Sequence, residues 1–299
     1  MSIIESHIPN QEVKLNVKNV KYPQTKDPNS PQNFFCSAFA GSRGSGKTWL
    51  SCKLVKSLYD KKVYDGEKVV PQRVILISPS AYSPSNNIFK LLNIDWDTDV
   101  YEDYSDKGLD EILEGLSRDQ DEAKEYRQYV KAYIKFEAIN NIDDLPIEQL
   151  MLLHSKDFID PERLPKPDFP DGFYTIIILD DVLGTSALRQ GRSRLTYYML
   201  KNRHTAGGIN FIINVQNLMA IPKSIRINLN FLAVFRFANK EVVLNDLAPL
   251  ISATTTIEEF NSLYTYATKD NQHDALIIDL TKSKPIFKRN LDTLLELKK

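Results

Sequence analysis

The chain has 299 residues and 42% hydrophobic content, enough to bury one large core or two modest ones. Its 38 basic and 39 acidic residues give a formal net charge of −1, so the bulk charge predicts neither attraction to nucleic acid nor repulsion from it. Two cysteines, Cys36 and Cys52, are too few for a disulfide framework and favour a reducing, intracellular setting. No apolar run approaches the length of a membrane span, so we expect a soluble protein.

We expect residues 1–32 to form an N-terminal arm and linker. The stretch EVKLNVKNV at 12–20 alternates apolar and polar residues, which is typical of an edge strand. The following YPQTKDPNSPQ at 22–32 has three prolines among turn-forming residues, as linkers often do. We therefore place one large domain at 33–299.

A phosphate-binding loop is indicated directly after the first apolar run, FFCSAFA at 34–40. The next eight residues, GSRGSGKT, have the spacing of a P-loop, and WLSCKLVKSLYD after them is typical of a helix. In such a loop glycines let backbone amides approach an anion, the lysine reaches the β/γ-phosphates and the hydroxyl residue binds Mg²⁺. The helix adds the positive end of its dipole. The predicted nucleotide-binding residues are Gly41, Ser42, Arg43, Gly44, Ser45, Gly46, Lys47 and Thr48, of which Lys47 is also catalytic and Thr48 also a metal ligand.

A compositionally different segment follows the second predicted strand, RVILISPS at 73–80. Between Asp95 and Glu125 there are thirteen acidic residues and three basic ones. Helices are indicated around LDEILEGL and AKEYRQYVKAYIKF, before the proline-rich DPERLPKPDFPD. We interpret about 95–170 as an acidic helical insertion, either a solvated surface or a docking face for a basic partner.

Two carboxylates end the third predicted strand, YTIIILDD at 174–181. An open α/β sheet places ligand-binding groups at this end of its strands. One carboxylate there can hold Mg²⁺, and a second can orient and deprotonate an attacking water. We assign Asp180 to the metal and Asp181 to the water as catalytic base. The alternative for an isolated pair is a helix N-cap.

The region after this pair is strongly basic. Val182 to Lys240 contains no Asp or Glu, which indicates an anion-facing surface. Double-stranded DNA is the natural polyanion, because neutralising phosphates needs no base recognition. Some of these side chains could instead pair with the insertion or with a neighbouring subunit. The nine basic residues are Arg189, Arg192, Arg194, Lys201, Arg203, Lys223, Arg226, Arg236 and Lys240.

Two further apolar runs, INFIINVQ at 209–216 and FLAVFRF at 231–237, complete five predicted strands. All five are continuous rather than alternating, as in parallel strands covered by helices on both faces. The predicted fold class is therefore α/β, with a mainly parallel central sheet flanked by helices. Gln216, which ends the fourth strand, could sense the γ-phosphate or position water, or it could be an ordinary loop residue.

The segments GSRGSGKT, IIILDD, NRHTAGGINFIINVQN and IPKSIRINLNFLAVFRF, in this order, resemble the poxvirus-type genome-packaging ATPases of large DNA viruses and virophages. These enzymes are a branch of the FtsK/HerA translocase superfamily, and the resemblance covers roughly 33–80 and 173–237. It implies a RecA-like P-loop NTPase of the additional-strand type, whose strand-terminal glutamine, here Gln216, faces the nucleotide. Many translocases of the superfamily carry glutamate where this chain has Asp181, although a double Asp is familiar in the packaging branch.

The sequence has neither an adenine-reading motif nor an NKxD guanine signature, so it does not identify the base of the nucleotide. The resemblance implies ATP, with Mg²⁺, as the cofactors. The implied function is an ATP-hydrolysing motor that translocates double-stranded DNA, without sequence specificity, into a viral capsid. A homo-oligomeric ring is expected, with capsid or portal-vertex proteins as partners. The expected location is the viral assembly site in the host cytoplasm, with the virion as a second location.

Ring motors commonly complete each site with an arginine from the neighbouring subunit. Arg203 and Arg226 are our candidates, and we prefer Arg203 because its segment ends a helix that leads directly to the strand at 209–216. Two other functions stay open: a P-loop kinase of a nucleoside or small molecule, and a nucleotide-switched interaction protein. A kinase would need an acceptor pocket and usually an arginine-rich lid, and neither is evident in the sequence.

Overall fold

The computed structural model describes residues 22–139, 142–189, 193–237, 247, 251 and 255–297. The strand expected at 12–20 lies outside this range, as do Arg192 and Lys240. Within the described residues a nine-stranded sheet has the order β11-β10-β9-β8-β1-β7-β6-β4-β5. None of the described helices has the combination of length and apolar character that a membrane span requires.

Six neighbouring strands of this sheet run parallel. They include the five apolar runs predicted from the sequence, because strands covered on both faces select apolar side chains at every position. The sixth, β5, is a two-residue strand beside β4. The bounds are β1 Cys36–Ala40, β4 Gln72–Ile77, β5 Val100–Tyr101, β6 Tyr174–Asp180, β7 Ile209–Val215 and β8 Phe231–Phe235.

The strand order places β7 between β1, which leads into the predicted P-loop, and β6, which ends in Asp180. Parallel pairing aligns the carboxyl ends of all three strands at one edge of the sheet, where the chain can assemble a ligand site. The mainly parallel sheet flanked by helices confirms the predicted α/β fold class.

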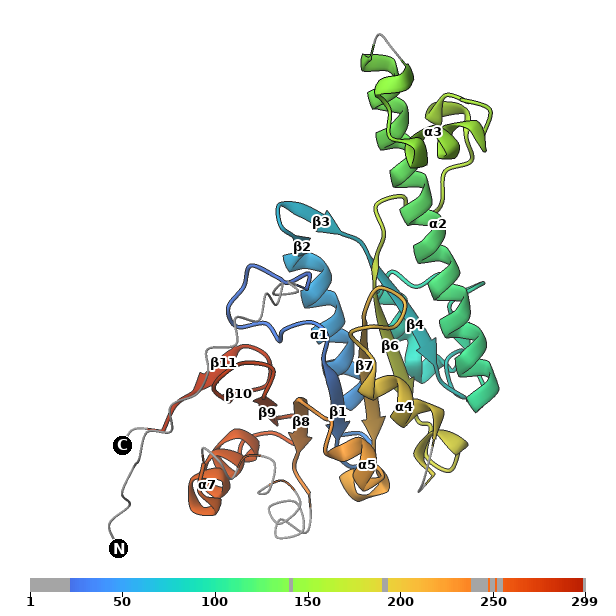
Figure 1. Cartoon of the computed structure of the whole chain (residues 1–299). Helices are drawn as coiled ribbons and strands as arrows, with labels where there is room; N and C mark the ends of the chain where they lie inside the picture. The colour runs from blue at the N-terminus through green and yellow to red at the C-terminus, as the bar shows by residue number, and fades with distance from the viewer. Residues whose placement is uncertain are drawn as a thin grey trace, which may run out of the picture.

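Helices cover both faces of the sheet (Figure 1). One face packs against α1 (Lys47–Lys61) and the 3₁₀ helix η1 (Pro84–Leu91), with phenylalanines such as Phe39 and Phe89 between the layers. The opposite face packs against α2, α4, α5 and α7. Their bounds are α2 Asp106–Ala138, α4 Arg194–Leu200, α5 Lys223–Arg226 and α7 Ile257–Thr268.

The acidic insertion contains one 33-residue helix, α2, where two helical stretches were expected. Ser105 caps its first turn by accepting a hydrogen bond from the Gly108 amide, and the sequence between the two stretches contains no proline to break it. The first half of α2 covers the sheet, whereas the distal half projects from the body and packs against α3, Ile147–His154 (Figure 1). The insertion is therefore partly a structural layer of the domain. Its short 3₁₀ helices are η2 Ile142–Asp144 and η3 Pro161–Arg163.

The remaining elements lie at the margins of the domain. A hairpin of β2 (Val63–Asp65) and β3 (Lys68–Val70) follows α1, and Gln24 pairs with Tyr64 beside it. The segment expected as a linker thus contacts the domain. At the other margin three antiparallel strands extend the sheet beyond β8. These are β9 Ala275–Asp279, β10 Ile286–Arg289 and β11 Thr293–Leu295, while the 3₁₀ turns η4 (Ser186–Leu188) and η5 (Leu218–Ala220) flank α4 and α5.

Candidate nucleotide-binding site

The GSRGSGKT stretch forms a tight loop between β1 and α1. Gly41 still belongs to the sheet edge, since its amide donates to the Val215 carbonyl at 3.1 Å. Gly44 and Gly46 have φ angles of +77° and +97°, the left-handed region in which side chains are strained. Gly46 ends the loop as the N-cap of α1, so that the free amides of the first helical turn point toward the loop. The backbone geometry fits an anion cradle.

Lys47 lies folded over this loop. Its Nζ donates to the carbonyl oxygens of Gly41 and Ser42, both at 2.9 Å. Burial lowers the pKa of Lys47, and the nearby carboxylates of Asp180 and Asp181 oppose that shift. An ammonium group that bonds to two backbone carbonyls can exchange them for the charged oxygens of a phosphate, which are stronger acceptors.

Asp180 and Thr48 meet across the gap between β6 and α1. Thr48 Oγ1 lies 3.2 Å from Asp180 Oδ1. Asp180 is only 5% exposed, and this burial raises its pKa, although the hydrogen bonds from Asn214 and Thr48 counteract the rise. The hydroxyl and carboxylate predicted to bind Mg²⁺ are therefore neighbours in the fold.

Asp181 and Gln216 line the same cleft, which has a volume of about 440 Å³. Asp181 is exposed and adopts φ +56°, a left-handed conformation that asparagine and aspartate enter more readily than other side chains. Gln216 directly follows β7 and is also exposed. The structure thus brings together all the site residues predicted on the P-loop, β6 and β7. Their chemical roles stay predictions.

Four polar residues of this cleft were not singled out in the sequence. Ser80, Ser83 and Asn86, on the segment after β4, line the cleft together with the P-loop residues Arg43 and Gly44. Asn214 lies on β7, directly opposite Asp180 in the strand register. Asn214 is one of two asparagines, with Asn210, in the buried strand β7, and a polar residue at a buried strand position was the available signal. Ser80 and Ser83 lie on the loop after β4 and Asn86 near the start of η1, where serine and asparagine are common for many reasons.

The donor set fits a nucleotide with its magnesium ion. Thr48 and Asp180 offer the hard oxygen ligands that Mg²⁺ prefers, and this ion usually combines one or two carboxylates with substrate phosphates. Among the described residues no group of three or more His, Cys, Asp or Glu side chains gathers into a separate metal site. Ser45 Oγ in the loop is buried and has no hydrogen-bond partner among the described residues.

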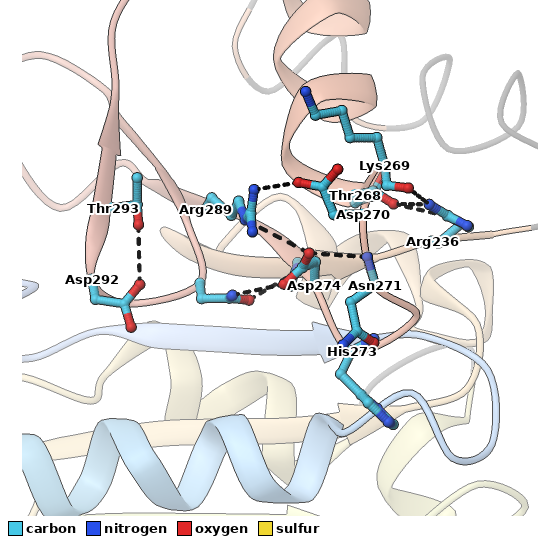
Figure 2. Close-up of polar contacts among 12 residues, drawn as sticks. Arg236, Thr268, Lys269, Asp270, Asn271, His273, Asp274, Arg289, Asp292 and Thr293 are labelled. Carbon is cyan, nitrogen blue, oxygen red and sulfur yellow. Dashed lines mark hydrogen bonds and ion pairs between the residues drawn. The ribbon is translucent and has the colours of Figure 1, made fainter.

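A second loop, residues 269–274 between α7 and β9, closes over the P-loop from the β9 side of the sheet (Figure 2). His273 Nδ1 lies 3.2 Å from the Ser45 carbonyl oxygen, so the ring nitrogen is the donor. Arg236 at the end of β8 holds the start of this loop by donating to the Thr268 carbonyl at 2.8 Å, and Arg289 pairs with Asp270 at 2.7 Å. The contact between His273 and Ser45 was not predicted from the sequence.

Arg203 and Arg226 lie apart from the cleft residues. Asn202, beside Arg203, bonds to the carbonyl oxygens of Phe34 and Ile209 at the starts of β1 and β7. Arg203 therefore lies near the amino end of β7, whereas Gln216 follows its carboxyl end. The seven residues of the strand separate the two by about 20 Å. Arg226 ends α5, where its Nη1 lies 2.7 Å from Met219 Sδ.

Two other predicted anion-binding residues have protein partners. Arg194 forms hydrogen bonds and an ion pair with Asp110 of α2, with nitrogen to oxygen distances of 2.8 to 2.9 Å. This is a pairing with the acidic insertion, the alternative considered for part of the basic set. Arg236 is engaged in holding the 269–274 loop. The described basic residues that are left as candidates for an anion surface are Arg189, Lys201, Arg203, Lys223 and Arg226.

No family model matches the chain, and no curated protein matches it. Several solved structures are similar. The genome packaging NTPase B204 of Sulfolobus turreted icosahedral virus 2, in complex with ATP-gammaS, is 13% identical with a TM-score of 0.41, over 85% of this chain and 96% of that one. EssC (ATPases 2 and 3) from Geobacillus thermodenitrificans is 16% identical with a TM-score of 0.44, over 88% of this chain and 41% of that one.

The cytoplasmic domain of the Thermomonospora curvata type VII secretion ATPase EccC is also similar. It is 13% identical with a TM-score of 0.42, over 90% of this chain and 24% of that one. Likenesses this distant carry no information on the activity or partners of this chain.

Proposed function

We propose that the protein is an ATP-hydrolysing motor that moves double-stranded DNA. The observation that carries the nucleotide half of this proposal is the contact between Thr48 Oγ1 and Asp180 Oδ1 at 3.2 Å, across the mouth of a P-loop. It joins the phosphate-binding loop to the strand end on which this class of enzyme places its metal and catalytic carboxylates.

Each cleft residue receives a role from its position. Lys47 binds the β- and γ-phosphates, while Thr48 and Asp180 would hold Mg²⁺. The ion, when bound, offsets charge on the phosphate oxygens. Asp181, at the exposed end of β6, orients a water and accepts its proton. Gln216 on the neighbouring strand senses the γ-phosphate.

DNA binding is assigned to exposed basic side chains of the 182–240 stretch, with Lys201 and Lys223 as the first candidates. Lys201 and Lys223 are both exposed. Neutralising either one to glutamine should weaken binding of all duplexes alike and reduce the slope of log K against log salt by about one unit. Arg194→Gln is the matched control, because Arg194 is already paired with Asp110 and should leave the slope unchanged. A base-specific loss would point to a regulator instead.

The working assembly is proposed to be a homo-oligomeric ring in which an arginine acts in trans. Arg203 lies too far from the cleft of its own chain to touch a phosphate there. The test mixes an Arg203→Ala chain with a Lys47→Ala chain, each inactive alone. Recovered activity at interfaces that join an intact P-loop to an intact Arg203 supports the assignment. No recovery in proven mixed rings moves the role to Arg226, tested in the same way.

The packaging role rests on the resemblance of the motif series and on the basic stretch. We propose packaging of a viral genome, with capsid or portal-vertex proteins as partners, at an assembly site in the host cytoplasm and with the virion as a second location. Phosphate release from ATP, measured with and without duplex DNA, tests the motor. Stimulation by DNA supports it, transfer of phosphate to a small acceptor indicates a kinase, and binding without turnover indicates a switch.

A further inference from the structure

Asn214 is a buried amide in the middle of the site whose hydrogen-bonding capacity is only half used. Its side chain is 2% exposed. Nδ2 donates to Asp180 Oδ1 at 2.7 Å and to Ser51 Oγ at 3.1 Å. Oδ1 is buried and accepts no hydrogen bond from the described residues. Buried polar atoms in folded proteins nearly always have a partner, so an unpartnered one requires an explanation.

The orientation of this amide follows from its neighbours. A carboxylate oxygen only accepts, so the atom facing Asp180 at 2.7 Å is the amide nitrogen. Ser51 Oγ already donates to the Thr48 carbonyl at 3.0 Å and can therefore accept from the same nitrogen. With both amide hydrogens used, Oδ1 can be satisfied only by a donor that the described protein atoms do not provide.

The position of Asn214 in the fold indicates which donor could satisfy this oxygen. Asn214 lies opposite Asp180 in the strand register and lines the cleft with Thr48. The hydrogen bonds from Thr48 and Asn214 both end on the same oxygen of Asp180, Oδ1. A donor beside this group is therefore next to the proposed metal ligands. Mg²⁺ keeps several of its waters when bound, and each of these waters is a strong donor.

We propose that Asn214 is a positioning residue for the metal. Through Nδ2 it fixes the orientation of the Asp180 carboxylate, and through Oδ1 it accepts a hydrogen bond from a water of the Mg²⁺ hydration shell. This inference rests on the proposed nucleotide site. It assigns to β7 a task separate from that of Gln216, which follows two residues later at the strand end.

The test compares ADP affinity in Mg²⁺ with ADP affinity in EDTA, by calorimetric titration, so that no turnover is needed. For Asn214→Leu we expect affinity in EDTA to stay within about twofold of wild type, while the tightening by Mg²⁺ falls about tenfold or more, as when other partners of metal ligands are removed. Higher Mg²⁺ concentration should restore the binding. Asn214→Ala leaves room for a water and should disturb folding less. It should also reduce the tightening of ADP binding by Mg²⁺.

Asn210 provides the matched control. It is a fully buried asparagine on the same strand. Its Oδ1 accepts a hydrogen bond from the Phe35 backbone amide at 2.8 Å, and its Nδ2 donates to Asn33 Oδ1, away from the cleft. Asn210→Leu should lower the melting temperature yet keep the full Mg²⁺ effect. An undiminished Mg²⁺ effect in the Asn214 variants overturns the inference, and so does an equal loss of affinity in Mg²⁺ and EDTA. A wild-type protein that binds no ADP overturns the proposed site itself.

Discussion

Replacing Gly41 with alanine is expected to destabilise the fold and weaken nucleotide binding together. A Cβ at this position would lie 2.7 Å from Phe235 Cβ and 2.6 Å from Ser45 Oγ. Phe235 is fully buried in β8, and its Cβ cannot move without the strand. The phosphate-binding loop must therefore shift to relieve the overlap.

Overpacking at a buried site costs about 1–3 kcal/mol in the free energy of unfolding. If the loop relaxes away from β8, it must return against the same strain to wrap the phosphates. Nucleotide affinity should then fall by a similar free energy, about 5- to 150-fold. Gly44→Ala is the control, because its Cβ would have no neighbour within 4 Å. That variant bears only the strain of a left-handed residue, about 1–2 kcal/mol, in both the free and the bound loop.

Urea unfolding and calorimetric titration with ADP measure the two effects on the same samples. We expect both glycine variants to lose stability, and Gly41→Ala to lose clearly more affinity than Gly44→Ala. A Gly41→Ala protein that unfolds at the wild-type urea concentration and binds ADP within twofold of wild type would refute the idea that β8 sets the position of the loop.

Further outcomes are expected at the cleft. Lys47→Ala should abolish tight nucleotide binding in a filter or calorimetric assay, since it removes the charge that meets the β/γ-phosphates; wild-type affinity would contradict the site. Asp181→Asn should keep Mg·ATP bound but slow phosphate release, whereas Asp180→Asn should weaken Mg²⁺-dependent binding; equal losses of affinity would contradict this division. Burial raises the pKa of Asp180 above its ordinary 3.8, so the folded state favours the protonated carboxyl. The stabilisation of the fold by this bound proton is lost as pH rises through the folded pKa. Mg²⁺-dependent ADP binding needs the carboxylate and should therefore fail, on acidification, at a pH above that of an ordinary aspartate. His273→Ala should weaken ADP binding several-fold equally in Mg²⁺ and EDTA, because it releases the Ser45 carbonyl of the loop rather than a metal ligand; an unchanged affinity would make the contact incidental.

The phosphate-binding half of the site was predictable because its chemistry is local in the chain. A loop that wraps an anion needs glycines at fixed spacing, and a buried strand that ends in a carboxylate is readable as an apolar run before Asp180. The parallel strands were predictable for the same reason, since burial on both faces leaves unbroken apolar sequence.

Features that depend on distant pairing were not predictable. Asn214 and Asn210 are two polar residues in the same buried strand, and only the strand register shows that Asn214 is the one opposite Asp180. His273 is 228 residues from Ser45, and nothing local marks their contact. β10 and β11 are short and partly exposed, so their apolar pattern is weak, whereas β9 is a buried apolar run as long as β1 that the sequence analysis did not identify. Two helical stretches were predicted where the structure has the single helix α2, because the polar residues between the stretches give no local signal that the helix continues.

The shape of α2 has a consequence for how the molecule opens. The helix is about 50 Å long at 1.5 Å per residue, and its distal part shares a small cluster of Tyr129, Ala132, Leu145 and Leu153 that is separate from the two clusters on the sheet. So few buried side chains cannot hold a unit folded by themselves, and the distal part gains its order from the proximal half of the same helix. Amide exchange there should follow a local fraying equilibrium, with protection rising turn by turn toward the sheet, while the strands exchange only when the whole domain unfolds.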